Sequence, residues 1–225
     1  MKRKINISLM VIAGLLLLNA CSSRETVSDK DGNLYEIIRI GEQEWLSGNL
    51  NVSRFLNGDL IPEARTAEEW KSASENNQPA WCYYDNDPSN GQVYGKLYNW
   101  HAVSDPRGLA PEGWRIPVAD DWDQLIAFLG GDDVAGLVLK NTDLWNDYEG
   151  QNGNGNNASG FAGLPGGGRY DHGGFNFLGD YSGWWTTTQS APDRARIWRF
   201  THGIDNVYSY NLPTGYGLSV RCIRE

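Results

Sequence analysis

The segment from Gly113 to Pro117 and the residues directly after it constrain the fold more than any other part of the chain. Ile116 precedes a proline, which favours extended geometry, and Pro117 cannot continue a strand but is well suited to the start of a helix. Four apolar residues then recur at the spacing of one helical face: Trp122, Leu125, Ile126 and Leu129. A double glycine follows. The sequence therefore predicts an extended segment that turns directly into a packed helix.

The first twenty residues have the features of an export signal. Lys2-Arg3-Lys4 precede an apolar stretch from Ile5 to Leu18, which is too short for a comfortable membrane span. Leu18-Asn19-Ala20-Cys21 resembles the lipobox of bacterial lipoproteins, in which the cysteine becomes the lipidated first residue. We therefore expect a signal peptide over residues 1–20, lipidation of Cys21, a tether over residues 21–30 and a domain over residues 31–225. An ordinary secretory signal with a chance cysteine is the alternative.

The charge balance excludes some partners. The formal net charge of the 225 residues is −9, and removal of residues 1–20 with Lys2, Arg3 and Lys4 makes it −12. Nucleic acids and anionic lipid surfaces would repel such a chain. We therefore expect no nucleic-acid partner, and contact with the membrane through the lipid anchor.

With Cys21 lipidated, two cysteines remain. An exported protein meets an oxidising environment, and Cys82 and Cys222 both lie in apolar, strand-like settings. The sequence therefore predicts a Cys82–Cys222 disulfide. Two buried free thiols are the alternative.

Local patterns along the chain predict an α+β fold in one domain. Residues 34–40 and 43–46 flank Gly41-Glu42 as a β-hairpin, and Thr66 to Trp70 contains a capping box that begins a second short helix. Residues 81–84 are expected as an aromatic strand, residues 85–91 as a turn, and residues 150–179 as a long glycine-rich loop. Four strands are expected near 183–188, 196–200, 206–210 and 218–223. The expected architecture is two short helices in the N-terminal half, followed by a β-rich and loop-rich C-terminal half.

Several motifs occur in a fixed order between about Asp29 and Glu225. They are Asp31-Gly32-Asn33-Leu34-Tyr35, Gln43-Glu44-Trp45, Asn49-Leu50, the segment 81–87, Tyr94-Gly95-Lys96-Leu97-Tyr98-Asn99-Trp100, the segment 113–117, Ser159-Gly160-Phe161, Leu164-Pro165-Gly166-Gly167, Gly183-Trp184-Trp185-Thr186-Thr187 and Ser219-Val220-Arg221-Cys222. This set resembles the Fibrobacter succinogenes major paralogous domain of bacterial envelope proteins, which is common in gut Bacteroidetes.

The resemblance implies a fold similar to C-type lectins and formylglycine-generating enzymes. It also implies a lipid-anchored or secreted location, which we expect to be the outer membrane of the cell envelope. Val118 stands where these families usually place a Ser or Thr cap, so a slightly weaker helix start is expected. The formylglycine-generating enzymes need a catalytic cysteine pair that holds copper. Because Cys82 and Cys222 are both expected to be structural, that chemistry is not expected here.

Motifs for other chemistry are weak. Asp85 to Gly91 begins like a calcium loop, but its glycine falls one place late and Lys96 stands where a bidentate Glu is needed. Trp145-Asn146-Asp147 is similar to a tripeptide at the calcium site of sugar-binding lectins, without an evident partner motif. The histidines show no metal-ligand spacing. We therefore predict no catalytic residue, no metal site and no cofactor, with calcium left as an open alternative.

The function favoured by these observations is a non-catalytic binding module for a glycan or an envelope protein. Sugars present apolar ring faces bordered by hydroxyl groups, so their sites combine aromatic rings with polar side chains. Two stretches in expected loops have this composition, and they give the candidate ligand-binding residues Tyr170, Asp171, His172, His202, Asp205, Asn206 and Tyr208. Turn residues and packed strand aromatics are the competing interpretation. A structural component of a surface complex is the second functional hypothesis, and an enzyme with oxidase or hydrolase chemistry is the third.

Overall fold

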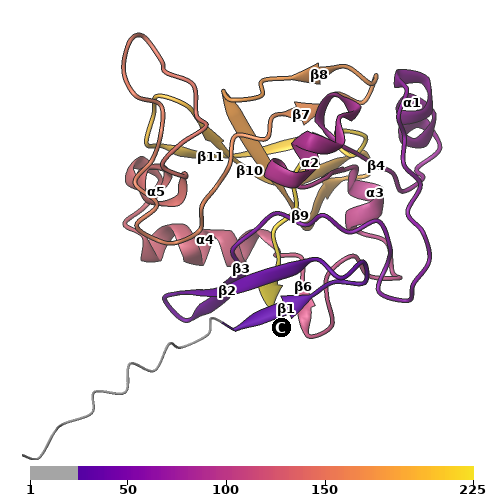
Figure 1. The fold of residues 1–225 in the computed structure, drawn as a ribbon, viewed down its shortest axis with the longest axis horizontal. Helices are drawn as coiled ribbons and strands as arrows, with labels where there is room; N and C mark the ends of the chain where they lie inside the picture. Colours follow the sequence, from indigo (N-terminus) through magenta and orange to yellow (C-terminus); the bar gives the residue numbers. More distant parts are fainter. Residues whose placement is uncertain (1–24) are drawn as a thin grey trace, which may run out of the picture.

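The two ends of the described chain meet in one antiparallel sheet. The structure, a computed structural model, describes residues 25–225 (Figure 1). The sheet has the strand order β1 (Thr26–Ser28), β2 (Leu34–Ile40), β3 (Gln43–Leu46), β12 (Ile223–Arg224) and β6 (Trp114–Arg115). The predicted hairpin over residues 34–46 is confirmed as β2 and β3. Arg224 Nη2 lies 3.2 Å from Glu25 Oε1, so an ion pair also joins the two ends.

A second sheet contains three long strands of the C-terminal half. Its order is β11 (Val207–Pro213), β10 (Arg194–Thr201) and β9 (Tyr181–Ala191), and all pairs are antiparallel. Three of the four predicted C-terminal strands are thereby confirmed. Successive side chains alternate between the two faces of this sheet. One face carries buried Trp184, Trp198 and Phe200, and the opposite face carries buried Trp185 and Ile197.

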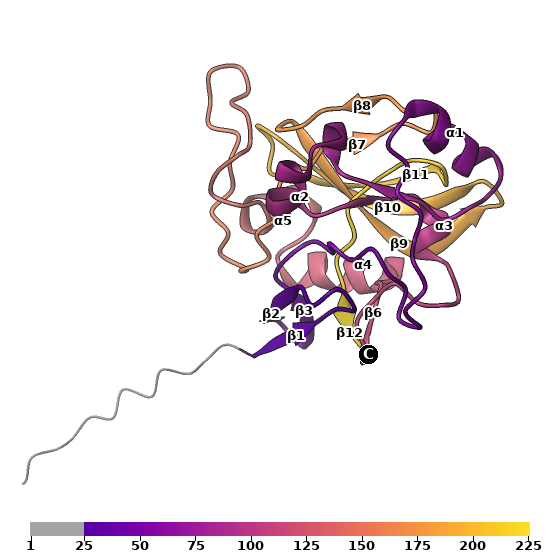
Figure 2. The same ribbon diagram turned by 45° about the vertical axis from the view of Figure 1, so that its right-hand side comes forward.

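Helix α4 (Ala119–Phe128) lies between the two sheets, as both ribbon views show (Figures 1 and 2). This is the helix predicted after Pro117. The ring centroid of its fully buried Trp122 lies 5.1 Å from that of Trp45 in the first sheet and 6.3 Å from that of Trp198 in the second. Phe161, from the glycine-rich segment, packs on Trp122 at 5.5 Å. The apolar stripe of this helix therefore joins both sheets into one core.

The start of α4 is capped by a neighbouring strand. Val118 has no side-chain acceptor, and its own N–H donates to Asp121 Oδ2 at 2.8 Å. The N–H of Ala119 donates to Thr188 Oγ1 of β9 at 2.9 Å. Arg115 forms an ion pair with Asp121 at 2.6 Å. The hydroxyl that the sequence lacks at the capping position is thus supplied from another element.

Helix α1 (Ala67–Glu75) confirms the second predicted helix, with Thr66 and Glu69 forming the capping box. Three further α-helices were not predicted: α2 (Pro88–Tyr94), α3 (Trp100–Val103) and α5 (Asp132–Leu139). The expected turn over residues 85–91 is wrong, because a short 3-10 helix at Tyr84–Asn86 leads into α2. Asp87 caps α2 by accepting from the N–H of Ser89 at 2.9 Å, and Pro88 occupies its first turn.

Two small ladders complete the fold. Strands β4 (Trp81–Cys82) and β5 (Leu97–Tyr98) pair with each other, as do β7 (Gly168–Arg169) and β8 (Phe175–Asn176) within the glycine-rich segment. The predicted last strand over residues 218–223 is shorter than expected and is confined to β12. Residues 218–222 bond in turn to segments near Tyr98, Trp185, Leu50 and Leu46, so they do not follow one partner strand.

Some sequence predictions concern the N-terminal segment. The predicted signal peptide and Cys21 lie outside the described residues. Residues 26–28 belong to the predicted tether, yet they form strand β1 and pair with residues 34–36 of β2. Residues 26–28 therefore belong to the first sheet. Within residues 25–225, the structure has no helix that is long and apolar enough to cross a membrane.

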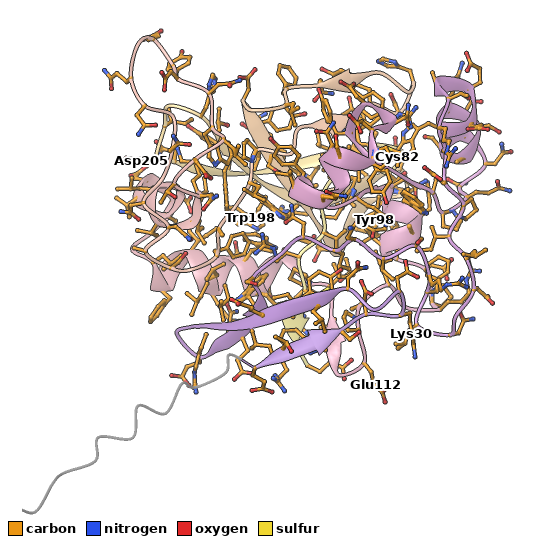
Figure 3. The ribbon with its side chains drawn as sticks, in the orientation of Figure 1. Lys30, Cys82, Tyr98, Glu112, Trp198 and Asp205 are labelled. Carbon is orange, nitrogen blue, oxygen red and sulfur yellow. The ribbon has the colours of Figure 1, made fainter. Side chains whose placement is uncertain are left out.

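The predicted disulfide between Cys82 and Cys222 is not formed in the structure. Both cysteines are buried free thiols. Cys82, labelled in Figure 3, lies in β4 and packs with Trp70 and Leu97. Cys222 precedes β12 and belongs to the larger cluster around Trp185. The two residues lie in different parts of the core, which sequence spacing does not reveal.

Candidate binding site

An aromatic cleft of about 220 Å³ opens on the face of the second sheet opposite α4. Its walls are aromatic rings, its base is aliphatic, and it contains one charged side chain. The lining residues are Tyr170, Phe177, Tyr181, Gly183, Ile197, Arg199, Tyr210, Leu212, Tyr216 and Leu218. We call this hollow the aromatic cleft.

The β7–β8 hairpin positions Tyr170 at the wall of the cleft. The N–H of Tyr170 donates to the carbonyl of Gly174 at 2.8 Å, which closes the loop between the two strands. The guanidinium of buried Arg169 donates to the carbonyls of Gly173, Ala64 and Thr66 at 2.7–2.9 Å. These bonds fix the hairpin against the start of α1, and Tyr170 is held by its connection to this anchor.

The base of the cleft depends on Gly183. This residue opposes Arg199 in the pairing of β9 with β10. A Cβ atom at residue 183 would lie 3.3 Å from both methyl carbons of Leu218 and 3.6 Å from Ile197. Any larger side chain at residue 183 would therefore extend into the space between β9 and the tyrosine walls.

Arg199 is stacked on the cleft wall. Its Cζ atom lies 4.3 Å from the ring centroid of Tyr210 and 5.6 Å from that of Tyr181. Its Nη2 donates to Tyr210 Oη at 3.0 Å. Cation–π attraction and this hydrogen bond together hold the guanidinium plane in place.

Burial raises the pKa of two tyrosines of the cleft, Tyr181 and Tyr216. Burial raises the pKa of Tyr181 well above its usual value, and the Tyr181 hydroxyl donates to Asn176 Oδ1 at 2.5 Å. Burial is also the main cause of the raised pKa of Tyr216, and the charge of Asp171 adds to it. The cleft thus offers ring faces, phenol hydroxyls and one permanent positive charge.

Four of the seven predicted binding residues lie in or beside the cleft. Tyr170 lines it, and His172 stacks on that ring with centroids 5.1 Å apart. Asp171 contributes to a smaller hollow together with His172 and α1. Tyr208 opposes Arg199 on β11, and its ring centroid lies 6.1 Å from that of Tyr210.

The other three predicted residues lie elsewhere. His202 packs edge-on against Tyr148, with ring centroids 5.0 Å apart, and its Nδ1 is 3.7 Å from Asp180 Oδ1. The carbonyl of Asp205 accepts from the N–H of Gly136 in α5, where Figure 3 shows Asp205 at one edge of the molecule. Asn206 donates to Asp133 of the same helix. The structure therefore does not bring all seven candidate residues together.

Sequence reasoning missed most of the cleft. The missed lining residues with polar or aromatic side chains are Phe177, Tyr181, Arg199, Tyr210 and Tyr216. The spacing of Tyr208 and Tyr210 along β11 could have indicated the site, because side chains two residues apart on a strand lie on the same face of the sheet. The pairing of Arg199 with this strand was not visible in the sequence.

The two weak calcium motifs have packing roles in the structure. The carboxylate of Asp87 caps α2 by accepting from the backbone N–H of Ser89, and this bond lowers the pKa of the carboxyl group. Trp145 is buried and donates to the carbonyl of Gly163 at 3.0 Å, while Asn146 donates to Asp180. In the part of the chain that the structure describes, no group of three or more His, Cys, Asp or Glu residues is placed to hold a metal ion.

Comparison with protein families matches residues 38–224 to the model described as the Fibrobacter succinogenes major domain. No curated protein and no solved structure matches the chain. The matched range begins within β2 and ends in β12, so it includes the second sheet, α4, every residue of the aromatic cleft and the first sheet apart from β1 and the start of β2.

Proposed function

The chain belongs to the Fibrobacter succinogenes major domain family, and we propose that it acts as a non-catalytic module that binds a glycan at the bacterial cell envelope. The observation that supports this proposal is the aromatic cleft. Tyrosine rings offer flat surfaces for the apolar faces of a sugar, and their hydroxyls can bond to its rim. The volume of about 220 Å³ is below the roughly 300–1,000 Å³ of sites for drug-sized ligands, which suits a single sugar ring.

The chemistry of the lining favours binding over hydrolysis. Glycosidases place two carboxyl groups on either side of the bond that they break. The described lining of the aromatic cleft contains no carboxylate. Its groups can stack, donate and accept, and these actions are sufficient for recognition.

The test is binding of the purified protein to a broad glycan array, with calcium and again with a chelator. We expect binding that resists chelation, because the aromatic cleft itself contains no metal-ligand cluster. In a follow-up on the best glycan, Tyr210→Ala should weaken affinity about tenfold, which corresponds to roughly 1.4 kcal/mol. Tyr148→Ala is the matched control, since Tyr148 is 43% exposed and Tyr210 is 38% exposed, but Tyr148 lies outside the cleft. An empty array, or equal affinity of the two variants, would contradict the proposal.

We also propose that the protein is anchored to the outer membrane through a lipid on Cys21. The support is the basic, apolar and cysteine-terminated pattern of residues 1–21. Each buried methylene of an acyl chain contributes about 0.8 kcal/mol to membrane affinity. Cys21→Ala should abolish incorporation of labelled palmitate in cells, and persistent labelling would count against lipidation at this residue.

The fold that we propose for the family is of the C-type lectin-like kind. The mixed α+β architecture and the loop-rich residues 150–179 support it. In this arrangement the cleft lies on the half of the molecule that carries the loops, away from the sheet that contains β1.

An assembly role through protein contacts is the second candidate. It is favoured by a separate, mainly apolar hollow of about 430 Å³ beside β6, lined by Leu56, Val103, Leu109, Ala110, Trp114 and Ile116 among others. A role of this kind predicts that Leu56→Glu removes a stoichiometric partner from the purified complex while glycan binding is unchanged.

A further inference from the structure

Arg199 is the one charged residue among the described residues that line the aromatic cleft. Two other partly exposed arginines in this acidic chain have carboxylate partners: Arg107 lies 2.8 Å from Asp105, and Arg115 lies 2.6 Å from Asp121. Within residues 25–225, no carboxylate lies within ion-pair distance of Arg199. Its positive charge is therefore not neutralised by the protein.

The hydrogen bonds of Arg199 are also incomplete. Its Nη2 makes one bond, to Tyr210 Oη, and its Nε is buried without an acceptor. Nη1 has no acceptor among the described residues. Buried Arg169 and Arg221 differ in this respect, because their N–H groups donate to carbonyl or amide oxygens. Nη1 and the second hydrogen of Nη2 form a pair of parallel donors with no oxygen to receive them.

The surroundings of Arg199 keep this donor pair accessible. Stacking on Tyr210 at 4.3 Å orients the guanidinium, and the residue paired with Arg199 on β9 is Gly183, which has no side chain to cover it. A planar guanidinium fork matches the two oxygens of a carboxylate, and such bidentate pairs are stronger than neutral hydrogen bonds. The ring walls of the same cleft suit the apolar face of a sugar.

We infer that the aromatic cleft is selective for an acidic sugar, a uronic acid unit whose carboxylate binds the Nη1 and Nη2 side of Arg199 while its ring lies against the tyrosines. This inference rests on the proposed function and adds to it the chemical class of the ligand. Neutral sugars would make the ring contacts alone.

The experiment compares matched pairs of ligands by isothermal titration at low salt. The probes are the methyl glycosides of glucose, galactose and mannose, each against the methyl glycoside of the corresponding uronic acid. We expect at least one uronide to bind tenfold or more tightly than its neutral partner, and this preference to decrease with added salt. Arg199→Met should abolish the preference, so that the acidic and the neutral glycoside of a pair bind with equal affinity. Arg199→Lys should lose most of the preference, because it retains the charge without the fork.

Arg196→Met is the matched control. Arg196 lies on the same strand, but residues 196 and 199 project from opposite faces of the sheet, so its replacement removes the same charge without touching the cleft. Thermal unfolding of each variant establishes that it is folded. Equal binding of neutral and acidic glycosides, or a preference that survives Arg199→Met, would overturn the inference and leave the proposed function standing. If neither kind of glycoside binds and the glycan array is also empty, both are overturned.

Discussion

Four cations are buried in this domain, and oxygen atoms and aromatic rings surround them in place of carboxylates. They are Lys96, Lys140, Arg169 and Arg221, each at most 3% exposed. The ammonium of Lys140, for example, donates to the carbonyls of Gly153, Thr201 and Ile204 at 2.8–3.3 Å. Burial lowers the pKa of this ammonium, yet its three hydrogens are all used. Each such cation joins chain segments that have few regular hydrogen bonds of their own.

Arg221 is the most buried of the four, and its removal should be costly. It donates to the carbonyls of Leu46 and Phe161 and to Asn49 Oδ1 at 2.6–3.2 Å. Arg221→Met would remove the guanidinium donors from both carbonyls, whereas Asn49 Oδ1 would keep the bond from Trp184 Nε1 at 2.8 Å. Because each unsatisfied group costs roughly 1–3 kcal/mol, we expect the free energy of unfolding to fall by about 3–5 kcal/mol.

Urea unfolding followed by tryptophan fluorescence measures this difference. Arg194→Met is the control, because Arg194 is exposed and donates only to the carbonyl of Asn211. Its effect should lie within about 0.5 kcal/mol. A loss of less than 1 kcal/mol for Arg221→Met would show that the buried guanidinium is not a structural hub.

The two buried cysteines should be chemically inert in the native protein. Burial raises the pKa of Cys82 to about 12, and it raises that of Cys222 further still. Because the thiolate is the reactive form, iodoacetamide at pH 8 should modify neither residue in the folded state. In denaturant without reductant, mass spectrometry should show that both are alkylated. If alkylation needs reductant as well, the two thiols are bridged, which would contradict the assignment of both as free thiols.

At the scale of single elements, α4 depends on a cap that its own sequence does not supply. Thr188→Val removes the hydroxyl that accepts from the N–H of Ala119 and keeps the shape of the side chain. We expect the free energy of unfolding to fall by about 1 kcal/mol. Thr187→Val is the matched control, since the Thr187 hydroxyl has no hydrogen-bond partner in the described residues and that variant should change stability by less than about 0.5 kcal/mol. Equal effects would contradict the capping role.

The elements that the sequence predicted correctly are those with a strong local signal. Helix α4 has a complete apolar stripe, α1 has a capping box, and β9 to β11 are rich in aromatic and β-branched residues. Helix α5 was missed although Asp132 and Asp133 stand in its first turn, because its eight residues give too short a pattern. The last strand was predicted too long, because the backbone of residues 218–222, directly before β12, bonds to a different segment at nearly every residue.

The candidate site was predicted in part for the same reason. Tyr170 and Tyr208 were identified because aromatic and polar residues are adjacent in the chain around them. The cleft itself forms where β9, β10 and the β7–β8 hairpin come together, and its central residue, Arg199, lies on a strand whose register is set by long-range pairing. The local amino-acid composition does not predict which strands pair or in which register.

At the scale of the whole molecule, the two sheets have separate roles. The first sheet unites both ends of the described chain, and β1 places residue 26 within it. The second sheet is buried on the α4 side and forms the aromatic cleft on the other. A lipid anchor at Cys21 would therefore hold the molecule by its first sheet, and the cleft belongs to a different part of the fold.

The most direct test of the account is an NMR titration of the aromatic side chains with the best-binding glycan. Carbon–proton spectra of the tyrosine rings report each residue separately. We predict that the resonances of Tyr170, Tyr181, Tyr210 and Tyr216 shift together with one saturation curve, while those of Tyr148 and Tyr35 stay unchanged. Saturable shifts at Tyr148 with none in the cleft would place the binding site elsewhere and contradict the central claim.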